Sequence, residues 1–323
     1  MEISQKLKSS FPILYQLYSY AKDYKQLRIN RKIAKQIHRM SSEALMDYDA
    51  ELYFRRIGHK LDWNNLQTWT EKMQWEKIFD NNPEKIICAD KYEVRKWVAE
   101  RIGDKYLIPL IGVWDRYNDV SFADLPQKFV MKTNHGSGDI VIVPAKDKMT
   151  LADRLAMRRV ISIAERMDYG AEFCELHYSK MKSKVIAEEL IGEEGADLQD
   201  YKFFCFGGIP YYCMVYTSRR EGLKQYVYDM DWKLQNWGTA DYVQKKDDVP
   251  KPEHFDEMLG VVKALSKGFS HVRVDLYNVR GKIYFGEMTF TGASGFHRFS
   301  SEEADYHLGQ LWDVDCKMEM RNE

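Results

Sequence analysis

Apolar residues recur at helical spacing in the first part of the chain. They do so over 73–79, directly after Thr68 and Glu71, which have the spacing of a helix-capping box. A second helical pattern occupies 90–98, and the apolar run at 107–113 predicts a short strand. The sequence therefore predicts a mainly helical region that extends to about residue 125.

From residue 128 onward, apolar and polar residues mostly alternate, which is the pattern of half-buried strands. Two helices interrupt this part of the chain, one over 151–167 with Thr150 as its N-cap and one over 252–267. Helices first and antiparallel strands afterwards are the order of an α+β fold. The predicted strands are 128–133, 140–143, 185–191, 201–206, 210–215, 225–228, 271–277 and 282–290.

The composition excludes several classes of protein. Of the 323 residues, 45% are hydrophobic and 30% are charged, which excludes disordered, collagen-like and multi-span membrane proteins. The net charge of −1 does not favour binding to nucleic acid, so we predict no nucleic-acid partner. The five cysteines form no C-x-x-C pair, which indicates reduced thiols in a cytoplasmic protein.

Positive charge is concentrated at the N-terminus. Residues 1–40 contain nine Lys and Arg and two Asp and Glu, a net charge of +7, so the total of −1 leaves −8 for 41–323. Such a basic helical segment can bind an anionic membrane surface or a polyanionic partner, or it can be an ordinary solvated helix. No apolar run is long enough to span a membrane. We therefore expect a cytoplasmic protein, at the inner face of the membrane if this segment binds lipid.

A glycine-rich hairpin follows one predicted strand in the sequence Lys132-Thr-Asn-His-Gly-Ser-Gly138. Backbone N–H groups of such a loop can close over phosphates while the lysine ammonium pairs with their charge. The segment is not a P-loop, because no G-K-[ST] follows it. A plain tight turn is the alternative interpretation.

Two acidic strand ends are further candidates. The strand at Ile186-Ala-Glu-Glu-Leu-Ile191 becomes acidic where it ends, so its backbone and a carboxylate could contact an adenine edge. In the hairpin 272–289, Arg273 and Asp275 share one face of their strand, and Glu287 and Thr289 share a face of the next. Oxygen ligands on adjacent strands suit Mg²⁺. Solvated acids and a cross-strand Arg–Glu pair are the respective alternatives.

The predicted metal pair depends on the register of this hairpin. A two-residue turn at Val279-Arg280 would place Asp275 and Glu287 on opposite faces of the sheet. An odd-numbered loop or a bulge near 278–281 would bring the two carboxylates together. A metal site at these residues therefore requires one of these two irregularities.

The motif D-x-D, found in metal-dependent glycosyltransferases, occurs three times, at 47–49, 229–231 and 313–315, which shows how little it specifies.

The order of the other motifs is more informative. Asp90-Lys91-x-x-Val94-Arg95, the hairpin 132–138, Asp200-Tyr-Lys-Phe-Phe-Cys-Phe206, and 272–277 with 286–290 resemble the TupA-like ATP-grasp family. That family is implicated in the synthesis of bacterial teichuronopeptide, capsule and other surface polysaccharides. The resemblance covers about residues 60–300 and omits the basic N-terminal helix.

The resemblance implies an ATP-grasp fold, in which two α+β subdomains hold ATP and Mg²⁺ between them. It also implies a division of the chain into four segments. They are a basic helical N-terminal segment (1–60), a helical region (61–125), a lid subdomain with the glycine-rich hairpin (126–192) and a C-terminal subdomain with the metal site (193–323).

The resemblance further implies a role for each motif. Arg273 would stabilise an acylphosphate or the substrate carboxylate, Lys202 would point towards phosphate, and Thr289 replaces an asparagine that many relatives use as a metal ligand. The implied metal ligands are Asp275, Glu287 and Thr289. The implied ATP contacts are Lys91, Lys132, the backbone of His135, Gly136, Ser137 and Gly138, the adenine hinge of Glu188, Glu189, Leu190 and Ile191, and Asp200 at the ribose.

ATP-grasp ligases join a carboxylate to an amine through an acylphosphate. The resemblance therefore implies an ATP-dependent ligase that attaches an amine or amino acid to a uronic-acid-type carboxylate on a saccharide or lipid-linked saccharide. A glycosyltransferase that uses a nucleotide sugar, an ATP-dependent kinase and a nucleotide-binding module without catalysis are the alternatives.

Overall fold

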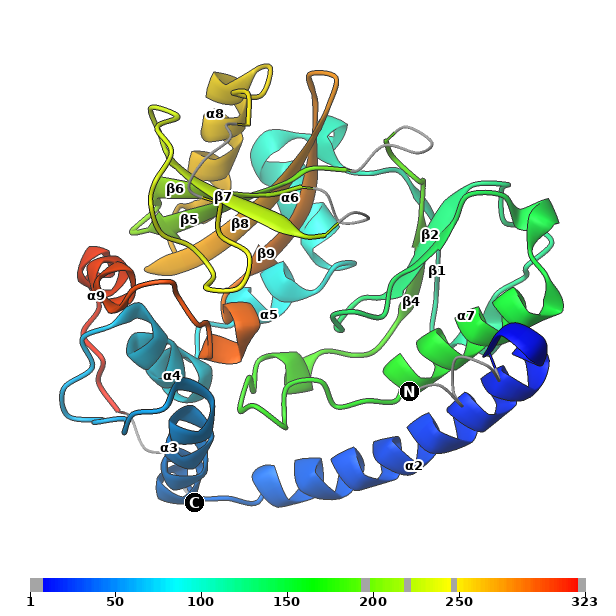
Figure 1. Cartoon of the computed structure of the whole chain (residues 1–323), viewed down its shortest axis with the longest axis horizontal. Coiled ribbons are helices and arrows are strands. Elements are labelled where there is room, and N and C mark those ends of the chain that lie inside the picture. The colour runs from blue at the N-terminus through cyan, green and yellow to red at the C-terminus, as the bar shows by residue number, and fades with distance from the viewer. Residues whose placement is uncertain (1–7, 193–197, 218–221, 245–248, 319–323) are drawn as a thin grey trace.

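The computed structural model describes residues 8–192, 198–217, 222–244 and 249–318. Residues 1–7 of the basic N-terminal segment lie outside the described residues. Two antiparallel sheets lie on opposite sides of the molecule, with helices packed on each (Figure 1). This architecture agrees with the predicted α+β fold.

The first sheet has the strand order β1-β4-β2-β3, and every described pairing in it is antiparallel. Helix α7 packs on it and buries an apolar layer that includes Phe129, Met157 and Ile161. Thr150 and Asp153 form the capping box that begins this helix. The elements are β1 (Leu110–Trp114), β2 (Phe129–Thr133), β3 (Val141–Val143), α7 (Leu151–Ala164) and β4 (Val185–Glu188).

The second sheet has the order β7-β6-β5-β8-β9 and is also antiparallel. One face packs on helices α6 and α8 through the apolar side chains of Tyr201, Phe203 and Val274. The opposite face carries Lys202 and Asp275, so the alternation along each strand separates the core from the polar site. The elements are β5 (Asp200–Phe206), β6 (Ile209–Thr217), β7 (Lys224–Asp229), α8 (Phe255–Ser266), β8 (His271–Val279) and β9 (Lys282–Thr289).

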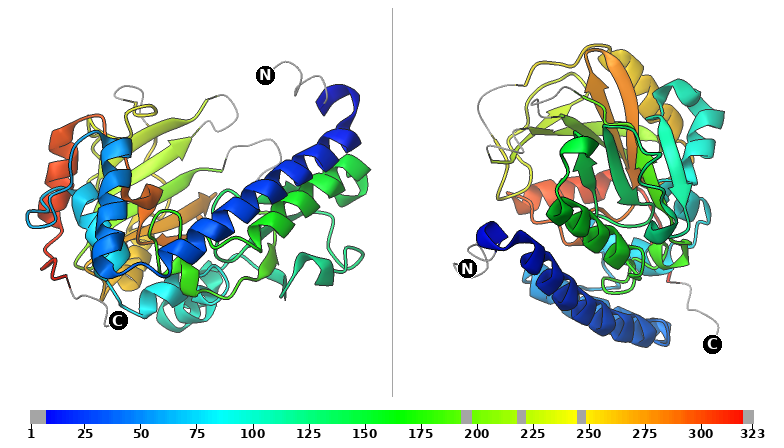
Figure 2. Two further views of the ribbon diagram at one scale, coloured as in Figure 1. Left: turned by 90° about the horizontal axis from the view of Figure 1, so that it is seen from below. Right: turned by 90° about the vertical axis from the view of Figure 1, so that its right-hand side faces the viewer.

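The remaining helices surround the two sheets. Figure 2 shows α2 running alongside α7, beneath the first sheet. Helix α4 begins with the predicted capping box at Thr68 and Glu71. The helices are α2 (Pro12–Ile37), α3 (Ser42–Ile57), α4 (Trp69–Phe79), α5 (Glu84–Ala89), α6 (Val94–Ile102) and α9 (Glu302–Leu311), with 3-10 turns η1 (Asp104–Tyr106), η2 (Tyr117–Asp119), η3 (Lys146–Lys148), η4 (Tyr178–Lys180) and η5 (Gly292–Gly295).

Buried charged groups tie the helices to the second sheet. The Glu76 carboxylate on α4 lies 2.7 Å from the Lys85 ammonium on α5 and 3.2 Å from His271 Nδ1 on β8. Each of these side chains is about 1 or 2% exposed. Since a buried charge is costly unless it is paired, these contacts hold α4 and α5 in one position against the sheet. That position fixes the end of α5, where the motif Asp90-Lys91 begins.

Several elements differ from the sequence-based predictions. The helix expected over 90–98 begins only at Val94, because the Asp90 carboxylate accepts hydrogen bonds from the N–H groups of Tyr92 and Glu93 and holds a turn. Strand β4 ends at Glu188, three residues before the predicted end. Helix α9 was not predicted. Strand β1 belongs to the first sheet, although it lies in the segment assigned to the helical region.

The hairpin β8–β9 contains a two-residue turn and a bulge. Its turn is Arg280-Gly281, one residue later than the turn considered from the sequence, and both residues have positive φ. The register then shifts at Gly286, so that Asp275 faces Glu287 directly. The predicted irregularity therefore exists, but it lies at Gly286 rather than near 278–281.

We predict that Gly286→Ala destabilises this hairpin. A Cβ atom at Gly286 would lie 3.0 Å from the backbone oxygen of Asp275 and 3.1 Å from the Tyr277 ring. Overpacking of this kind costs about 1–3 kcal/mol, measured as the free energy of unfolding in urea. Gly260→Ala is the matched control, because its Cβ would meet no atom within 4 Å on an exposed face of α8. Equal stability of the two variants would contradict a steric requirement at the bulge.

Candidate active site

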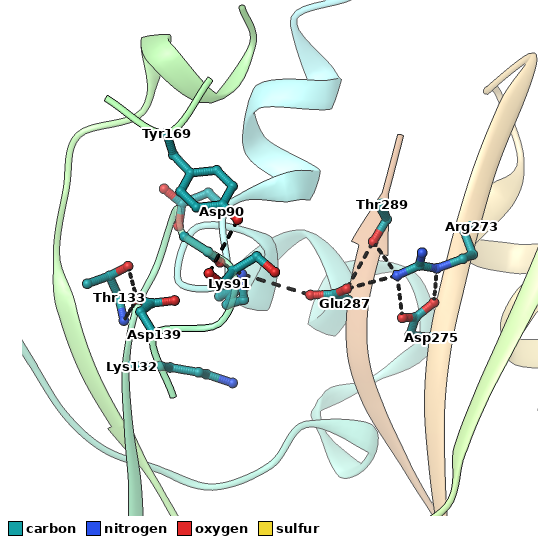
Figure 3. A network of polar contacts seen from close by, with 12 residues as sticks. Asp90, Lys91, Lys132, Thr133, Asp139, Tyr169, Arg273, Asp275, Glu287 and Thr289 are labelled. Atoms are coloured by element: carbon teal, nitrogen blue, oxygen red, sulfur yellow. Dashed lines mark hydrogen bonds and ion pairs between the residues drawn. The ribbon is translucent and has the colours of Figure 1, made fainter. Parts of the chain in front are cut away.

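Lys91 lies where the two sheets approach one another. Its backbone N–H donates to the Asn134 carbonyl at 2.9 Å, and the Asn134 amide donates to the Asp90 carboxylate at 2.6 Å. The Lys91 ammonium donates to the Gly136 carbonyl at 2.6 Å and lies 3.9 Å from Glu287 Oε2 (Figure 3). One lysine therefore contacts both the glycine-rich hairpin and the predicted metal pair.

The glycine-rich hairpin is closed by Asp139, whose carboxylate accepts hydrogen bonds from the Thr133 N–H at 2.8 Å and from the Thr133 hydroxyl. A Cβ atom on Gly136 would lie 2.8 Å from both of these side chains, so a larger residue does not fit. Gly138 has a φ of +78°, which favours glycine. Ser137 and Gly138 are exposed, and this leaves their backbone accessible to a ligand.

Two aromatic side chains support this hairpin, His135 within it and Tyr169 outside it. The His135 ring is buried, with Nε2 3.2 Å from the Met167 carbonyl, and burial lowers its pKa. The Tyr169 hydroxyl donates to the Ser137 carbonyl at 3.3 Å (Figure 3). His135 therefore supports the loop through its side chain, and any contact with phosphate is left to its backbone.

Charged side chains of β5, β8 and β9 form one network. Arg273 donates two hydrogen bonds to the Asp275 carboxylate, at 2.7 and 2.8 Å, and one to Glu287 at 3.1 Å. The Lys202 ammonium lies 2.5 Å from Asp275, and the Thr289 hydroxyl donates to Glu287 at 3.0 Å. Figure 3 shows Arg273, Asp275, Glu287 and Thr289 pointing toward one another. The structure thus brings the predicted catalytic and metal residues together.

The charges around Glu287 keep it ionised. Its burial alone would raise the pKa, but the cations of Lys91, Lys202 and Arg273 and the hydrogen bond from Thr289 outweigh burial and lower the pKa to about 2. A carboxylate with a lowered pKa stabilises the folded state fully above its ordinary pKa of 4.5, and that stabilisation is lost progressively as the pH falls from there to about 2. Glu287 is therefore available as an anionic ligand across the physiological range.

The residues present fit a Mg²⁺ ion that is coordinated partly by the protein and partly by a bound substrate. Within the described ranges, no group of three or more His, Cys, Asp or Glu side chains is placed to hold a metal on its own. Asp275, Glu287 and Thr289 supply two carboxylates and a hydroxyl on adjacent strands. Mg²⁺ commonly takes one or two carboxylates and completes its shell with phosphate oxygens and water. Binding would require Arg273 and Lys202 to release part of their contact with Asp275.

A second charged cluster lies on the first sheet. The Glu188 carboxylate pairs with the Lys132 ammonium at 2.6 Å and with the Arg95 guanidinium at 2.9 Å. Both oxygens of Glu188 thus contact cations, and its predicted contact with adenine stays a prediction. Glu189 is exposed, and its N–H donates to the Pro109 carbonyl at 3.0 Å. Leu190 and Ile191 follow it at the end of the described segment.

The other predicted residue, Asp200, is buried at the start of β5, and its carboxylate lies 3.8 Å from the Lys202 ammonium. Sequence reasoning assigned no role to Arg95, Asn134 or Tyr169. Arg95 stood inside the quoted motif Asp90-Lys91-x-x-Val94-Arg95, which was the available signal. Asn134 stood inside the quoted hairpin motif, while nothing in the sequence distinguished Tyr169 from other tyrosines.

Residues 71–313 match the family described as TupA-like ATPgrasp. The match covers most of the chain, so the protein belongs to the TupA-like ATP-grasp family. This membership confirms the predicted family and the predicted ATP-grasp fold. No curated protein matches the chain.

Solved structures of ATP-grasp enzymes are also similar to the chain. The D-alanine–D-alanine ligase of Bacillus anthracis, complexed with ATP, has a TM-score of 0.40 and 16% identity, with 70% of this chain and 63% of that chain covered. The D-cycloserine synthetase DcsG has a TM-score of 0.41 and 16% identity, with 82% of this chain and 92% of that chain covered. The chain thus spans less than two thirds of the first of these enzymes. The assignment rests on the family match, because both TM-scores are low.

We predict that Glu287→Gln weakens Mg²⁺ binding at least tenfold in the presence of ADP, as measured by calorimetry. Glutamine keeps the shape and can still accept from Arg273, so the variant should fold. It loses the charge that Lys91, Lys202 and Arg273 stabilise, so its melting temperature should fall somewhat. Because the pKa of Glu287 is about 2, the difference between variant and wild type should persist from pH 7 to pH 5. Thr289→Asn should be tolerated.

Glu303→Gln, an exposed change on α9, is the matched control and should leave Mg²⁺ affinity unaltered. If Glu287→Gln bound Mg²⁺ as tightly as wild type, Glu287 would not be a metal ligand.

Proposed function

We propose that the protein is an ATP-dependent ligase that joins a carboxylate to an amine through an acylphosphate. The observation that supports this most strongly is the position of Lys91, between the glycine-rich hairpin at Gly136 and the carboxylate of Glu287. In the proposed complex, the triphosphate lies in this place. Lys91 and Lys132 pair with its charge, and the backbone of residues 136–138 covers it.

The first step needs charge neutralisation and alignment more than covalent help. A carboxylate oxygen of the substrate attacks the γ-phosphorus, the bond to the bridging oxygen breaks, and ADP leaves. Arg273 and Lys202 stabilise the charge on the transferred group, as preorganised cations do in a buried site. Asp275, Glu287 and Thr289 would hold Mg²⁺, which supplies neutralisation of the phosphate oxygens.

In the second step, the amine attacks the acyl carbon, phosphate leaves, and the nitrogen loses a proton. The mixed anhydride must be kept from water during this time. The exposed residues Ser137 and Gly138 lie at the tip of the hairpin and can close over the site. For the nucleoside, we propose that the segment 188–191 contacts adenine and that Asp200 contacts the ribose.

The family resemblance suggests a saccharide or lipid-linked saccharide that carries a uronic-acid-type carboxylate, in capsule or surface-polysaccharide synthesis, and an amine or amino acid as the second substrate.

The glycosyltransferase alternative loses support at two of its three D-x-D motifs. Asp49 is buried against Lys77 at 2.6 Å, and Asp229 accepts hydrogen bonds from the N–H groups of Asp231 and Lys233 in a turn.

We predict that Mg²⁺–ATP raises the melting temperature and that a UDP-sugar does not. A ligand at a hundred times its Kd stabilises the folded state by about 2.7 kcal/mol. Lys132→Ala should remove most of this effect while Lys128→Ala, an exposed change just before the same strand, should not. Stabilisation by the UDP-sugar alone would favour the glycosyltransferase. Formation of a stable phosphorylated product without any amine would favour the kinase.

Helix α2 has an exposed stripe with two parts. Leu14, Tyr18 and Ala21 form its apolar part, and the same stripe continues, at alternating spacings of three and four residues, as basic side chains. The basic members are Lys25, Arg28, Lys32 and Lys35. Leu14 is 56% exposed and Tyr18 is 62% exposed, whereas Leu27 and Ile37 on the other side are buried. No helix in the described ranges is long and apolar enough to cross a membrane.

Such a stripe suits an anionic membrane surface, because the apolar part can enter the interface while the basic part pairs with lipid headgroups. We predict that Leu14→Ser with Tyr18→Ser reduces sedimentation with anionic vesicles and leaves ATP binding unchanged. Lys25→Gln with Arg28→Gln should also weaken binding, and only this charge contribution should fade with salt. Lys96→Gln on α6 is the control. Unchanged sedimentation of all variants would show that the stripe is solvated.

A further inference from the structure

A basic cavity of about 510 Å³ lies beside the proposed ATP site. Its walls come from α3, from the segment before β4 and from the turn after β9, which is drawn in orange near α4 in Figure 1. Among the described residues, no carboxylate lines it. The lining residues are Arg55, Arg56, Phe173, Ala293, Ser294, Phe296 and Arg298.

The number of guanidinium groups in this cavity exceeds the number of carboxylates paired with them. Arg55 pairs with Glu51 at 2.7 Å, and the Arg56 guanidinium lies 5.4 Å from the centre of the Phe173 ring. In the described part of the chain, Arg55 is the only one of the three cavity arginines that is paired with a carboxylate. A concave surface lined by three guanidinium groups raises the local concentration of anions.

One wall of the cavity has an unusual backbone. Ala293 and Ser294 both have left-handed conformations, with φ of 51° and 55°. Residues without glycine's freedom adopt this conformation at a cost, and they keep it only where the surroundings enforce it. Buried Glu175 enforces it here, because its two oxygens accept from the hydroxyls of Thr291 at 2.5 Å and Ser294 at 2.7 Å. The shape of this wall is therefore fixed before any ligand binds.

This wall continues directly from the strand of the proposed metal site. A Cβ atom on Gly292 would lie 3.1 Å from Arg273 Nη1, so the turn starts in contact with the charged network. Ser294 follows Thr289 by five positions in the sequence, so these two residues lie at most about 18 Å apart. A substrate of two or three sugar rings has a length of the same order as this distance.

We propose that this cavity binds the acceptor as an anionic saccharide, with its acidic groups on Arg56 and Arg298 and ring faces against Phe173 and Phe296. The proposal rests on the ligase function proposed above and specifies its acceptor. A sugar acid combines apolar ring faces with charge, which matches two phenylalanines placed among arginines. An acidic peptide fits less well, since the cavity is lined by a helix and turns and offers no strand edge for backbone pairing.

The test is calorimetry on the full chain with Mg²⁺ and ADP present, using trigalacturonate, a sugar phosphate, neutral maltotriose and triglutamate as probes. Wild type should bind trigalacturonate and not maltotriose. Arg56→Gln with Arg298→Gln should weaken that binding at least tenfold, and Arg298→Gln alone should weaken it less. Arg39→Gln, an exposed change between α2 and α3, is the matched control and should bind as wild type.

The melting-temperature shift by ATP is measured in the same variants and should be retained, which separates this proposal from the ligase proposal. Binding of the sugar phosphate in place of trigalacturonate would support an anionic saccharide whose charge is phosphate. Three results would overturn the proposal: neither anionic sugar binds, the double variant binds as well as wild type, or triglutamate binds as tightly as trigalacturonate.

Discussion

The contact of one ammonium group with both halves of the site is the feature on which the rest of the structure depends. Lys91 reaches the Gly136 carbonyl of the first sheet's hairpin and approaches Glu287 of the second sheet. It can do so because buried Glu76 and Lys85 fix α5 and because Asp90 and Asn134 fix the turn after it. The helices before the first strand therefore align two sheets that otherwise have separate cores.

Each cation discussed for the site has an anionic or carbonyl partner within the protein. Lys132 pairs with Glu188, while Lys202 and Arg273 pair with Asp275. Such pairing avoids the cost of isolated charges in a partly buried site. In the proposed function, the phosphates of ATP replace the carboxylates as partners of the lysines, and Mg²⁺ becomes the partner of the carboxylates. Binding therefore leaves no charge of the site without a partner.

Much of the fold could be predicted because it is encoded locally. The capping boxes at Thr68 and Thr150 and the alternation along the strands gave most elements to within a few residues. The pairing of Asp275 with Glu287 could be predicted only on the condition that the hairpin contains an irregularity. That irregularity is a bulge, which depends on the close approach of Gly286 to the partner strand. The pair of Arg95 with Glu188 joins residues 93 positions apart, and no local pattern encodes such a contact.

We propose that ATP lies between the two sheets with its phosphates at Lys91 and Lys132. The decisive measurement is a crystal structure of the protein with a non-hydrolysable ATP analogue and Mg²⁺. We expect phosphate oxygens at hydrogen-bond distance from both ammonium groups and a Mg²⁺ ion bound by Glu287. A nucleotide bound elsewhere, with Lys132 still paired to Glu188 and Asp275 still paired to Arg273, would contradict it.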